Sequence, residues 1–547
     1  MKSTSAKIII LIISIIAVNL ISSTFYKRFD LTKDKRYTLS ETTQNLLANI
    51  DGPIYINVYL EGDFPSEFKR LQVETKQYLE ELKALNKNIK FQFIEPLNQA
   101  EALIKKGLQP SRLSVQEDGK VSEAVIFPWA TVTYNNKTEN VSLLAGQTSA
   151  TQEEQLQNSI RNLEYAFANA IHKVSTERKQ KIAILRGNGE LEDKYLVGFL
   201  RQLRQYYKLA PFTLDSVSKN PQKTLQELTG YDLAIIAKPT EKFTEEEKFT
   251  LDQYLINGGK TLWLIDNVNA ELDSLMQTGQ TLAFNRDLNL TDLLFSYGIR
   301  INYTLLKDIQ CATISLASGN SGNQTQYQDF PWYYYPLIIP TNDHPITANL
   351  NRVRLRFAST IDTLKNSKIS KTVLLQSSPY SKPFGTPRII SLDEVAKKPS
   401  QQDFNKGNQT LGVLLEGQFT AAYANRVKPF ETKLYKDKSK PNKMVVIADG
   451  DVIANELFQG IPLDLGLDKW TKIHYDNAPF LMNTIDYMLD DIGLLKLRSK
   501  NIQLQFLDKQ KAYKERTFWQ LVNVIFPLGL LLIFGLLYTF LRKRKFS

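Results

Sequence analysis

Apolar and polar positions follow a regular order in the middle of the chain, between Lys181 and Asn267. Short apolar runs alternate with stretches in which apolar residues recur about every helical turn. The predicted strands occupy residues 181–186, 211–217, 231–237 and 261–266, and the predicted helices follow Glu190, contain Leu225 and begin after the cap residue Thr244. Strands that alternate with helices pair in parallel through right-handed crossovers. The pattern therefore predicts a doubly wound α/β layer.

A second α/β pattern lies between residues 25 and 150. Its predicted elements are a helix capped by Ser40, strands at 54–60 and 89–94, a long helix from Pro65 to Leu85, a short helix at 100–105 and strands near Leu113 and at 125–134. This order resembles a thioredoxin-like domain. The domain has no Cys-x-x-Cys sequence, which excludes redox chemistry for it.

A helix at residues 151–178 is predicted to connect the two patterns. It begins with a capping box at Thr151 and carries an apolar stripe formed by Leu156, Ile160, Leu163, Phe167, Ile171 and Val174. We favour an interpretation in which the stripe packs the helix across the two domains. A partner-binding face is the alternative.

Both ends of the chain carry long apolar stretches. Residues 6–24 approach the roughly 20 residues that a membrane-spanning helix needs, and residues 519–541 contain no charge. We interpret 6–24 as an uncleaved anchor because no Ala-x-Ala site follows it, with a cleaved signal peptide as the alternative. The sequence thus predicts one transmembrane helix at each end, a juxtamembrane segment at 501–518 and a basic tail at 542–547.

Two spans place both termini on the same side of a membrane. The lysines and arginines at the termini favour the cytoplasm. Basic residues such as Lys27 and Lys511 also flank the opposite ends of the spans. Because long domains translocate largely regardless of charge, we expect an inner-membrane protein with the bulk of the chain in the periplasm and both termini in the cytoplasm.

Composition excludes several classes of protein. Six of the eleven net positive charges lie at the two ends, which leaves about +5 for the rest, and no basic stripe with interleaved aromatic residues is present. Nucleic-acid binding is therefore not expected. A single cysteine, Cys311, excludes an internal disulfide and a cysteine-based zinc site. Three histidines, His172, His344 and His474, lie far apart in sequence, so we expect no metal site and no cofactor.

The regular pattern weakens between residues 270 and 443, where Gly, Asn, Ser and Pro residues around 318–328 and 399–409 are loop signals. Strand-like runs occur at 353–357, 372–376 and 411–416 within this predicted irregular insertion. The α/β pattern returns at 444–451, and residues 477–489 are predicted to form a helix that covers the sheet. Segments on both sides of the insertion are thus predicted to complete one sheet, in a domain of residues 179–500.

The aromatic run at residues 330–336 allows two interpretations. An aromatic strand packed on the core is favoured. Aromatic faces that stack on a sugar or another ring are the alternative.

Candidate ligand-binding residues follow the predicted strands, because doubly wound folds bind ligands at the carboxyl ends of their strands. They are Gly187, Asn188, Gly189, Glu190, Asp266, Asp449 and Asp451. The Gly-x-Gly turn could hold a phosphate on its N–H groups, but acids crowd the next helix start, which favours an ordinary tight turn. Asp449 and Asp451 could hold Mg²⁺ if Asp266 lies beside them. A turn built by Asp-Gly is the favoured interpretation.

Motifs along essentially the whole chain resemble the GldG family, an accessory or substrate-binding component of an ABC transporter linked to gliding motility in Bacteroidetes. The motifs comprise Asp30, Leu31 and Thr32 with Tyr37, Thr38, Leu39 and Ser40, then Gly187-x-Gly189-Glu190, Gly258-Gly259-Lys260, Trp332-x-Tyr334-x-Pro336, His344-Pro345-Ile346, Asp449-Gly450-Asp451 and Arg498-Ser499-Lys500. Relatives commonly read Gly-His-Gly-Glu where this chain has Asn188. Imidazole chemistry at that turn is therefore not carried over.

The resemblance implies a permease subunit and a cytoplasmic ABC ATPase as partners, with gliding-motility or envelope proteins as further candidates. This chain has no Walker A sequence and is not expected to hydrolyse ATP. Its middle domain is similar to class I glutamine amidotransferase-like folds, but Cys311 does not lie in the nucleophile elbow that their chemistry needs. We expect a non-enzymatic extracytoplasmic component of an ABC-type transporter complex. The alternatives are a periplasmic ligand-binding protein and a structural scaffold for envelope or motility machinery.

Overall fold

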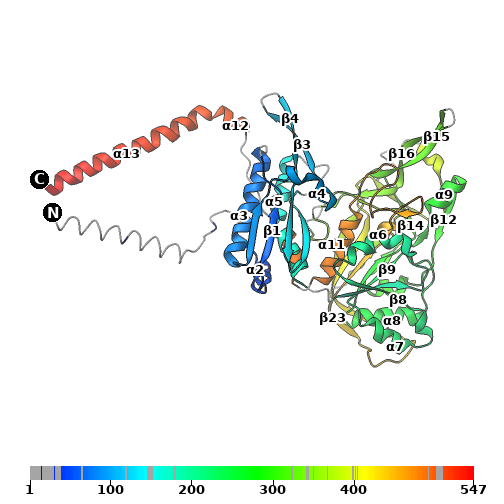
Figure 1. The fold of residues 1–547 in the computed structure, drawn as a ribbon. Helices are drawn as coiled ribbons and strands as arrows, with labels where there is room; N and C mark the ends of the chain where they lie inside the picture. Colours follow the sequence, from blue (N-terminus) through cyan, green and yellow to red (C-terminus); the bar gives the residue numbers. More distant parts are fainter. Residues whose placement is uncertain are drawn as a thin grey trace. The chain divides into compact units, whose positions relative to one another are not determined.

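The computed structural model describes Ser14, Asp30 and residues 38–62, 66–117, 120–144, 152–176, 180–321, 324–340, 344–348, 350–365, 368–396, 399–400, 402, 404–490, 492–499 and 509–546. The predicted first span at 6–24 therefore lies outside the described residues, apart from Ser14. The chain divides into two compact units, Met1–Lys500 and Asn501–Ser547. The first unit contains all of the sheets (Figure 1).

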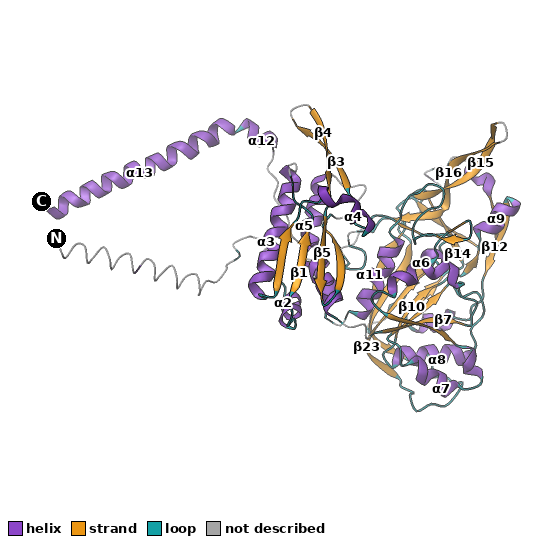
Figure 2. Ribbon diagram, in the orientation of Figure 1, coloured by secondary structure: helices purple, strands orange, loops and turns teal. Residues whose placement is uncertain are grey.

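A four-stranded sheet lies near the beginning of the first unit, in the order β2-β1-β5-β6. Its strands are β1 (Ile54–Val58), β2 (Ile89–Phe93), β5 (Trp129–Tyr134) and β6 (Lys137–Ser142), and its neighbouring helices are α2 (Glu41–Ala48), α3 (Ser66–Leu85) and α4 (Ala100–Lys105), the last preceded by the 3-10 turn η1 (Leu97–Gln99). Strands β1 and β2 are parallel, whereas β5 runs antiparallel to β1 and β6 (Figure 2). The predicted order of helices and strands is confirmed through α4 and through the strand near Leu113, which is β3 (Ser111–Glu117).

The predicted strand at 125–134 is wrong in one respect, because two separate strands share it. β4 (Lys120–Ile126) pairs with β3 (Ser111–Glu117) in a hairpin of its own, and β5 begins at Trp129. Pro128 lies between them and has no backbone N–H to donate to a ladder. The edge strand β6 was not predicted, since its sequence, Lys-Thr-Glu-Asn-Val-Ser, is almost wholly polar.

The connecting helix is α5 (Gln152–Ser175). The six residues of its predicted apolar stripe are all buried: Leu156, Ile160, Leu163, Phe167, Ile171 and Val174. The stripe packs against α2, α3, β5, β6 and the 3-10 segment η6 (Leu494–Ser499). The stripe is therefore a packed face of the helix, and most of the elements that α5 contacts belong to the N-terminal part of the chain.

A seven-stranded sheet forms the centre of the first unit, in the order β19-β22-β23-β10-β9-β7-β8. Its strands are β7 (Lys181–Arg186), β8 (Lys208–Thr213), β9 (Leu233–Ala237), β10 (Lys260–Leu264), β19 (Ile369–Gln376), β22 (Thr410–Thr420) and β23 (Lys438–Ile447). The five strands from β23 to β8 are parallel, as predicted. The strand predicted at 211–217 lies at Lys208–Thr213 instead and is followed by the 3-10 turn η2 (Asp215–Ser218).

Helices cover both faces of this sheet. On one face, α6 (Asp193–Leu203) and α11 (Asn477–Leu489) pack against side chains such as Ile235 and Val445. On the other, α7 (Pro221–Leu228), α8 (Glu245–Ile256) and α10 (Thr291–Ser296) pack against side chains such as Ile236 and Val446. The predicted cap of α8 is confirmed as a full capping box between Thr244 and Glu247.

The region 270–443 is more regular than predicted. It supplies β19 and β22 to the main sheet, and a long hairpin of β15 (Cys311–Ser321) and β16 (Gln324–Ile338) replaces the loop predicted around 318–328. Gly, Ser and Asn residues occur there because they surround the hairpin turn. The other short elements between residues 268 and 462 are β11 (Val268–Asn269), α9 (Leu272–Thr278), β12 (Gln280–Asn285), β13 (Ile299–Ile301), β14 (Thr304–Asp308), β17 (Val353–Arg354), β18 (Ile361–Thr363), β20 (Ser381–Gly385), β21 (Arg388–Ser391), η3 (Leu392–Ala396), η5 (Asp451–Ile453), β24 (Leu457–Phe458) and β25 (Ile461–Pro462).

The aromatic run at 330–336 forms part of a separate core beside the main sheet. Trp332, Tyr334 and Tyr335 are buried with Phe357 in this core. Core packing is therefore confirmed, and the alternative in which these three rings stack on a sugar is wrong.

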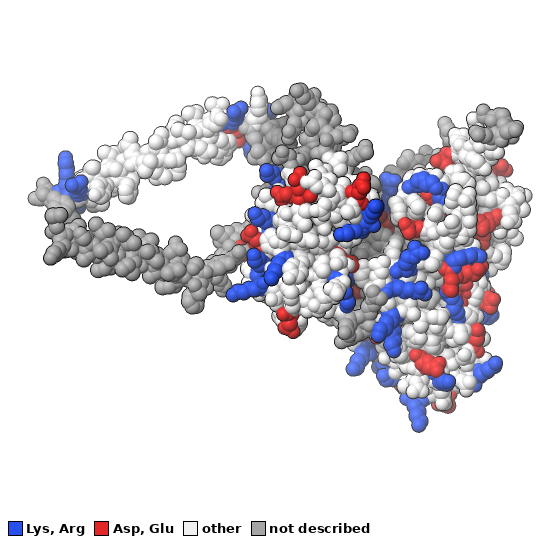
Figure 3. Space-filling model, viewed as in Figure 1, with Lys and Arg blue, Asp and Glu red and all other residues white. Residues whose placement is uncertain are grey.

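The second unit contains α12 (Lys509–Lys514) and α13 (Arg516–Phe546). Residues Arg516–Arg544 form a helix that is long and apolar enough to cross a membrane. Its surface is uncharged along most of its length, whereas basic and acidic side chains are interspersed on the visible face of the first unit (Figure 3). The predicted C-terminal span thus falls on a continuous helix.

Candidate functional site

Polar residues gather where β7, β9, β10 and β23 end. These four strands are parallel neighbours, so their carboxyl ends lie along one edge of the sheet. Asp266 follows β10, and Asp449 and Asp451 follow β23. The structure therefore brings these three carboxylates together, as the hypothesis of a cation site required.

The position that a cation would occupy is taken by the ammonium group of Lys238. Lys238 follows β9 in the left-handed conformation, with φ of 53°. Its Nζ lies 2.7 Å from Asp451 Oδ1, 3.1 Å from Glu271 Oε2 and 3.4 Å from Asp266 Oδ2. Within the described residues, no group of three or more His, Cys, Asp or Glu side chains is arranged to hold a metal ion.

The backbone around these carboxylates is tightly bonded. The Gly450 N–H donates to Asp266 Oδ1 at 2.5 Å, and the N–H groups of Asp451 and Arg356 donate to Asp449 at 2.7 and 2.6 Å. A Cβ atom at Gly450 would lie 2.5 Å from Lys238 Cγ. The favoured Asp-Gly turn is therefore present, and its glycine also makes room for the lysine side chain.

Burial and charge shift the pKa values of this cluster in opposite directions. Burial raises the pKa of Asp266 to about 6 and that of Asp449 well above its usual range. Burial alone would also raise the pKa of Asp451, but the Lys238 ammonium and the Arg356 guanidinium outweigh it and lower that pKa. Burial alone would lower the pKa of Lys238, and its carboxylate neighbours raise it instead. Lys238 therefore stays charged as the fixed cation of the cluster.

The turn from Gly187 to Glu190 is closed on itself. The carbonyl of Asn188 accepts the N–H groups of Thr240 and Glu241 at 2.9 and 3.0 Å. The Asn188 N–H, which a phosphate would need, donates to Glu190 Oε2 at 2.9 Å. Burial raises the pKa of Glu190. An ordinary tight turn describes this segment, and it offers no anion cradle.

Asn188 is the middle residue of the Gly187-x-Gly189 turn. Its side chain is buried, and Nδ2 donates at 3.0 Å to Glu247 Oε2, the oxygen that also accepts the N–H of the helix cap Thr244. Asn188 Oδ1 and Glu190 Oε1 are buried without a hydrogen-bond partner in the part of the chain that the structure describes. Asn188 therefore links this turn to the start of α8.

The residues of the N-terminal motif tie the chain to α5. Thr38 Oγ1 donates to Asp30 Oδ2 at 3.0 Å, and Ser40 caps α2 by accepting the N–H of Thr43. The Ser40 N–H donates at 2.7 Å to Glu164 Oε1, a buried carboxylate of α5. Leu39 is buried, whereas Leu31, Thr32 and Tyr37 lie outside the described residues.

The later motif residues are structural in character. Trp332 belongs to the aromatic core, and His344, which Pro345 follows, is half-buried with its ring 4.9 Å from that of Tyr487. Burial lowers the pKa of His344. None of these three residues lies among the polar groups at the strand ends described above.

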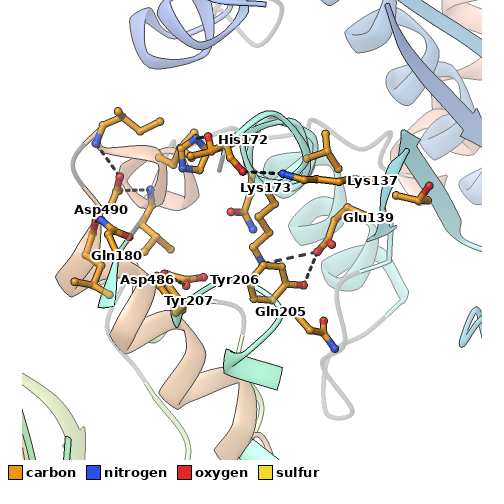
Figure 4. A pocket seen from close by; sticks show the side chains of 18 residues that line it. Lys137, Glu139, His172, Lys173, Gln180, Gln205, Tyr206, Tyr207, Asp486 and Asp490 are labelled. Carbon is orange, nitrogen blue, oxygen red and sulfur yellow. Dashed lines mark hydrogen bonds and ion pairs between the residues drawn. The ribbon is translucent and has the colours of Figure 1, made fainter. Parts of the chain in front are cut away.

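A cavity of about 580 Å³ lies at the opposite edge of the large sheet, where the strands begin. It is lined by β6, by the end of α5, by the segment between α6 and β8, and by the end of α11 with η6 (Figure 4). Tyr206 Oη donates to Glu139 at 2.8 Å, Tyr207 Oη donates to Asp486 at 2.7 Å, and Lys173 Nζ lies 3.8 Å above the Tyr206 ring. No local sequence pattern indicates this cavity, because its lining comes from segments spread between residues 137 and 495.

Comparison with known proteins gives a family match and distant relatives. The profile of a family described as an ABC-type uncharacterized transport system matches residues 179–484, and that of a domain of unknown function, DUF7088, matches residues 33–133. An uncharacterized protein of Borreliella burgdorferi is 22% identical over 535 residues, which covers 95% of this chain and 94% of that protein. Among solved structures, the mmIFT52 N-terminal domain matches with a TM-score of 0.32 and 14% identity, over 59% of this chain and 100% of that chain.

Proposed function

Since this chain belongs to the family described as an ABC-type uncharacterized transport system, we propose that it is a non-enzymatic, extracytoplasmic component of an ABC-type transporter complex. Its partners are a multi-span permease and a cytoplasmic ABC ATPase. The resemblance to the GldG family supports a link to gliding motility.

The proposed location is the inner membrane, with the bulk of the chain in the periplasm. The apolar helix α13 and its basic end support a C-terminal anchor whose terminus is cytoplasmic. Residues 6–24 supply the second anchor in this proposal. The domains are a thioredoxin-like domain at 25–150, the connecting helix at 151–178 and an amidotransferase-like domain at 179–500.

A mechanical role is supported by the contacts that two segments distant in sequence make with α5. Ser40, which follows the proposed first span, donates its N–H to Glu164 of α5. The 3-10 segment η6, which precedes the proposed second span in sequence, packs against the same helix. In this mechanism, ATP drives a conformational change in the partner subunits, and this change moves the two spans. Helix α5 then transmits the movement to the large sheet.

The chemistry of the described residues supports a role without catalysis. Cys311 lies on β15, and burial raises the pKa of its thiol to about 12. A thiol with so high a pKa is mostly protonated at neutral pH and is a poor nucleophile. The strand-end carboxylates are occupied by the Lys238 ammonium. No positioned nucleophile and base emerge from these groups.

Purification of the tagged full-length chain from its own membranes in mild detergent tests the proposal. We expect a permease and an ABC ATPase to co-purify in a fixed ratio that is the same at low and high salt. An unrelated two-span inner-membrane protein with the same tag is the control. Recovery of envelope or motility proteins without either transporter subunit would replace the transporter role with that of a structural scaffold.

A periplasmic ligand-binding role is a second candidate, and the cavity beside α5 favours it. Its volume of about 580 Å³ falls within the range of small-molecule sites. A ligand that binds there should raise the melting temperature of the purified chain in a thermal-shift screen. Loss of that shift on Tyr206→Ala, with retention on exposed Tyr513→Ala, would assign it to this cavity.

A further inference from the structure

Five large apolar side chains are exposed together at the edge of the sheet that carries the Lys238 cluster. They are Tyr327, Phe458, Ile461, Trp470 and Ile473, and we refer to them as the Trp470 surface. Trp470 is 52% exposed and Ile461 is 66% exposed. Isolated exposed apolar residues are common, but a contiguous group marks an interaction site.

Contacts between the side chains join this surface into one unit. The rings of Tyr327 and Trp470 are stacked, with centroids 5.6 Å apart and planes inclined by 24°. Phe458 and Ile461 face each other across a two-residue hairpin turn. The ammonium of Lys472, in the adjacent turn, lies 5.1 Å above the ring of Phe458. Tyr327, from a distant part of the sequence, therefore joins a hairpin and a turn that lie close together in the chain.

Both turns have backbone conformations that fix the direction of their side chains. Gln459 and Gly460 have φ of 51° and 78°, which is typical of a tight hairpin turn, and Lys472 has φ of 59°. Non-glycine residues adopt positive φ at an energetic cost. Trp470 and Ile473, which lie on either side of Thr471 and Lys472, are 52% and 49% exposed.

A network of buried charged side chains binds the backbone of the Trp470 turn. Asp468 Oδ1 accepts the N–H groups of Trp470 and Thr471, both at 2.9 Å, and Glu456 Oε2 accepts the N–H of Lys469 at 3.0 Å. The buried Arg354 binds both carboxylates, at 2.5 Å to Asp468 and 2.7 Å to Glu456. Ion networks of this kind contribute little net stability, and they serve to fix one geometry. The exposed turn is thus preorganised.

The same network reaches the strand-end cluster. Arg356 pairs with Glu456, its N–H donates to Asp449 at 2.6 Å, and its charge helps to lower the pKa of Asp451. The Trp470 surface is therefore connected through charged groups to the centre of the sheet edge.

The Trp470 surface and the segment that leaves the first unit lie near opposite ends of α11. Trp470 precedes the beginning of α11, whereas the chain continues toward the predicted membrane helix from the other end of α11, through η6. A helix of 13 residues separates these two points by about 20 Å. The surface therefore lies at the opposite edge of the sheet from the segment that leads to this chain's own anchor.

Charges at the rim indicate the chemistry of a partner. Lys469 Nζ lies 5.7 Å from the Trp470 ring, and Lys472 Nζ lies beside Phe458. Both ammonium groups border the apolar side chains. A complementary surface has an apolar anchor with carboxylates beside it.

We propose that the Trp470 surface is the docking site for a partner protein that offers apolar side chains flanked by carboxylates. Trp470 and Ile473 are its apolar anchors, and Lys469 and Lys472 pair with the flanking acids. This site goes beyond the transporter role, because it would serve a scaffold or a ligand-binding protein equally well.

Site-specific photo-crosslinking in the full-length chain tests this inference in the cells that make it. A photoreactive phenylalanine analogue replaces Tyr327, and the same analogue at Val427, which is 91% exposed, is the control. We expect a protein adduct at position 327 that is absent at 427. Trp470→Ala and the pair K469E/K472E should each lower its yield about tenfold or more, and K469R/K472R should preserve it.

Binding of the captured protein to the purified full-length chain completes the test. Its affinity should fall about tenfold with the lysine reversal and recover when a carboxylate of the partner is reversed to lysine. Ile473→Ser provides a second variant, and unchanged melting temperatures exclude misfolding. An adduct with lipid, an adduct with a second copy of this chain, or no difference between positions 327 and 427 would each overturn the proposal.

Discussion

Lys238 and Asp451 form an ion pair of 2.7 Å in which the lysine side chain is 6% exposed and the aspartate 14% exposed. The two residues follow strands β9 and β23, which are separated in the sheet by β10. Asp266, which follows β10, contributes a second carboxylate oxygen 3.4 Å from the same ammonium. A single lysine that follows β9 thus pairs with the acids that β10 and β23 bring to the same edge of the sheet.

Removal of that ammonium leaves buried acids without their counterion. We expect Lys238→Met to destabilise the first unit by about 3–5 kcal/mol at neutral pH, because the substitution leaves buried carboxylates without the cation that compensates their charge. Thermal denaturation of the detergent-solubilised chain measures the effect. Lys242→Met is the matched control, since Lys242 pairs with Asp287 in solvent, and it should leave the melting temperature almost unchanged. Equal losses in both variants would contradict the buried role.

Replacement of Lys238 by the smaller alanine should create a cation site. In Lys238→Ala, the carboxylates of Asp266, Asp451 and Glu271 still converge on the vacated position, and they are the oxygen ligands that Ca²⁺ and Mg²⁺ prefer. We expect millimolar Ca²⁺ to raise the melting temperature of this variant by several degrees and to leave the natural chain unchanged. A similar rise in both proteins would point to a cation site elsewhere.

Asp266 gives the cluster a predictable dependence on pH. Burial raises its pKa to about 6 in the folded protein, whereas the unfolded value is about 4. Its contribution to stability is therefore fully present below pH of about 4 and is lost as the pH rises through about 6. Asp266→Asn removes this dependence, so the variant should gain in melting temperature relative to the natural chain between pH 4.5 and 7. A constant difference across that range would contradict the raised pKa.

The attachment of α2 to α5 rests on Glu164. Its Oε1 accepts the Ser40 N–H at 2.7 Å and the Thr43 hydroxyl at 2.9 Å. Glu164→Ala leaves these donors without that acceptor, at a cost of about 1–3 kcal/mol. Hydrogen exchange should accelerate in residues 39–48 and stay slow in β9. Glu164→Gln retains an acceptor oxygen and should show much smaller changes, whereas equal acceleration in both variants would refute this role of the acceptor.

Several features of the fold could be predicted because they follow from short-range pattern. The runs at 181–186, 231–237 and 261–266 are apolar on both faces, which is typical of parallel strands covered by helices. The rule that parallel strands end at one edge also made Asp266 the candidate neighbour of Asp449 and Asp451. These inferences required no knowledge of contacts outside the sheet.

Other features depend on contacts that no local pattern carries. The Lys238 side chain reaches Glu271, beyond β10, and the sequence showed only a lysine between a strand and Pro239. The end of β15 and the beginning of β16 are rich in polar residues, so tertiary pairing overrides their weak strand propensity there. The cavity beside α5 exists only because segments from residue 137 to residue 495 meet.

The turn after β7 provides a test of how tightly the sheet edge is closed. Gly189 has φ of 69°, and an added Cβ atom would lie 2.2 Å from Thr240 Oγ1, the hydroxyl that donates to the Gly189 carbonyl at 2.8 Å. Gly189→Ala therefore combines a backbone cost of about 1–2 kcal/mol with a steric clash. Gly107→Ala is the matched control, because Gly107 has φ of 84° and no atom within 4 Å of the added Cβ.

We expect the loss of stability in Gly189→Ala to be at least twice that in Gly107→Ala, as measured by thermal denaturation. The double variant Gly189→Ala with Thr240→Ala removes the clashing hydroxyl, so it should be more stable than the sum of the two single losses indicates. Strict additivity would mean that the turn moves away from Thr240 when the methyl group is added. In that case the turn has room to open, and the phosphate cradle that its closed geometry argues against would have to be reconsidered.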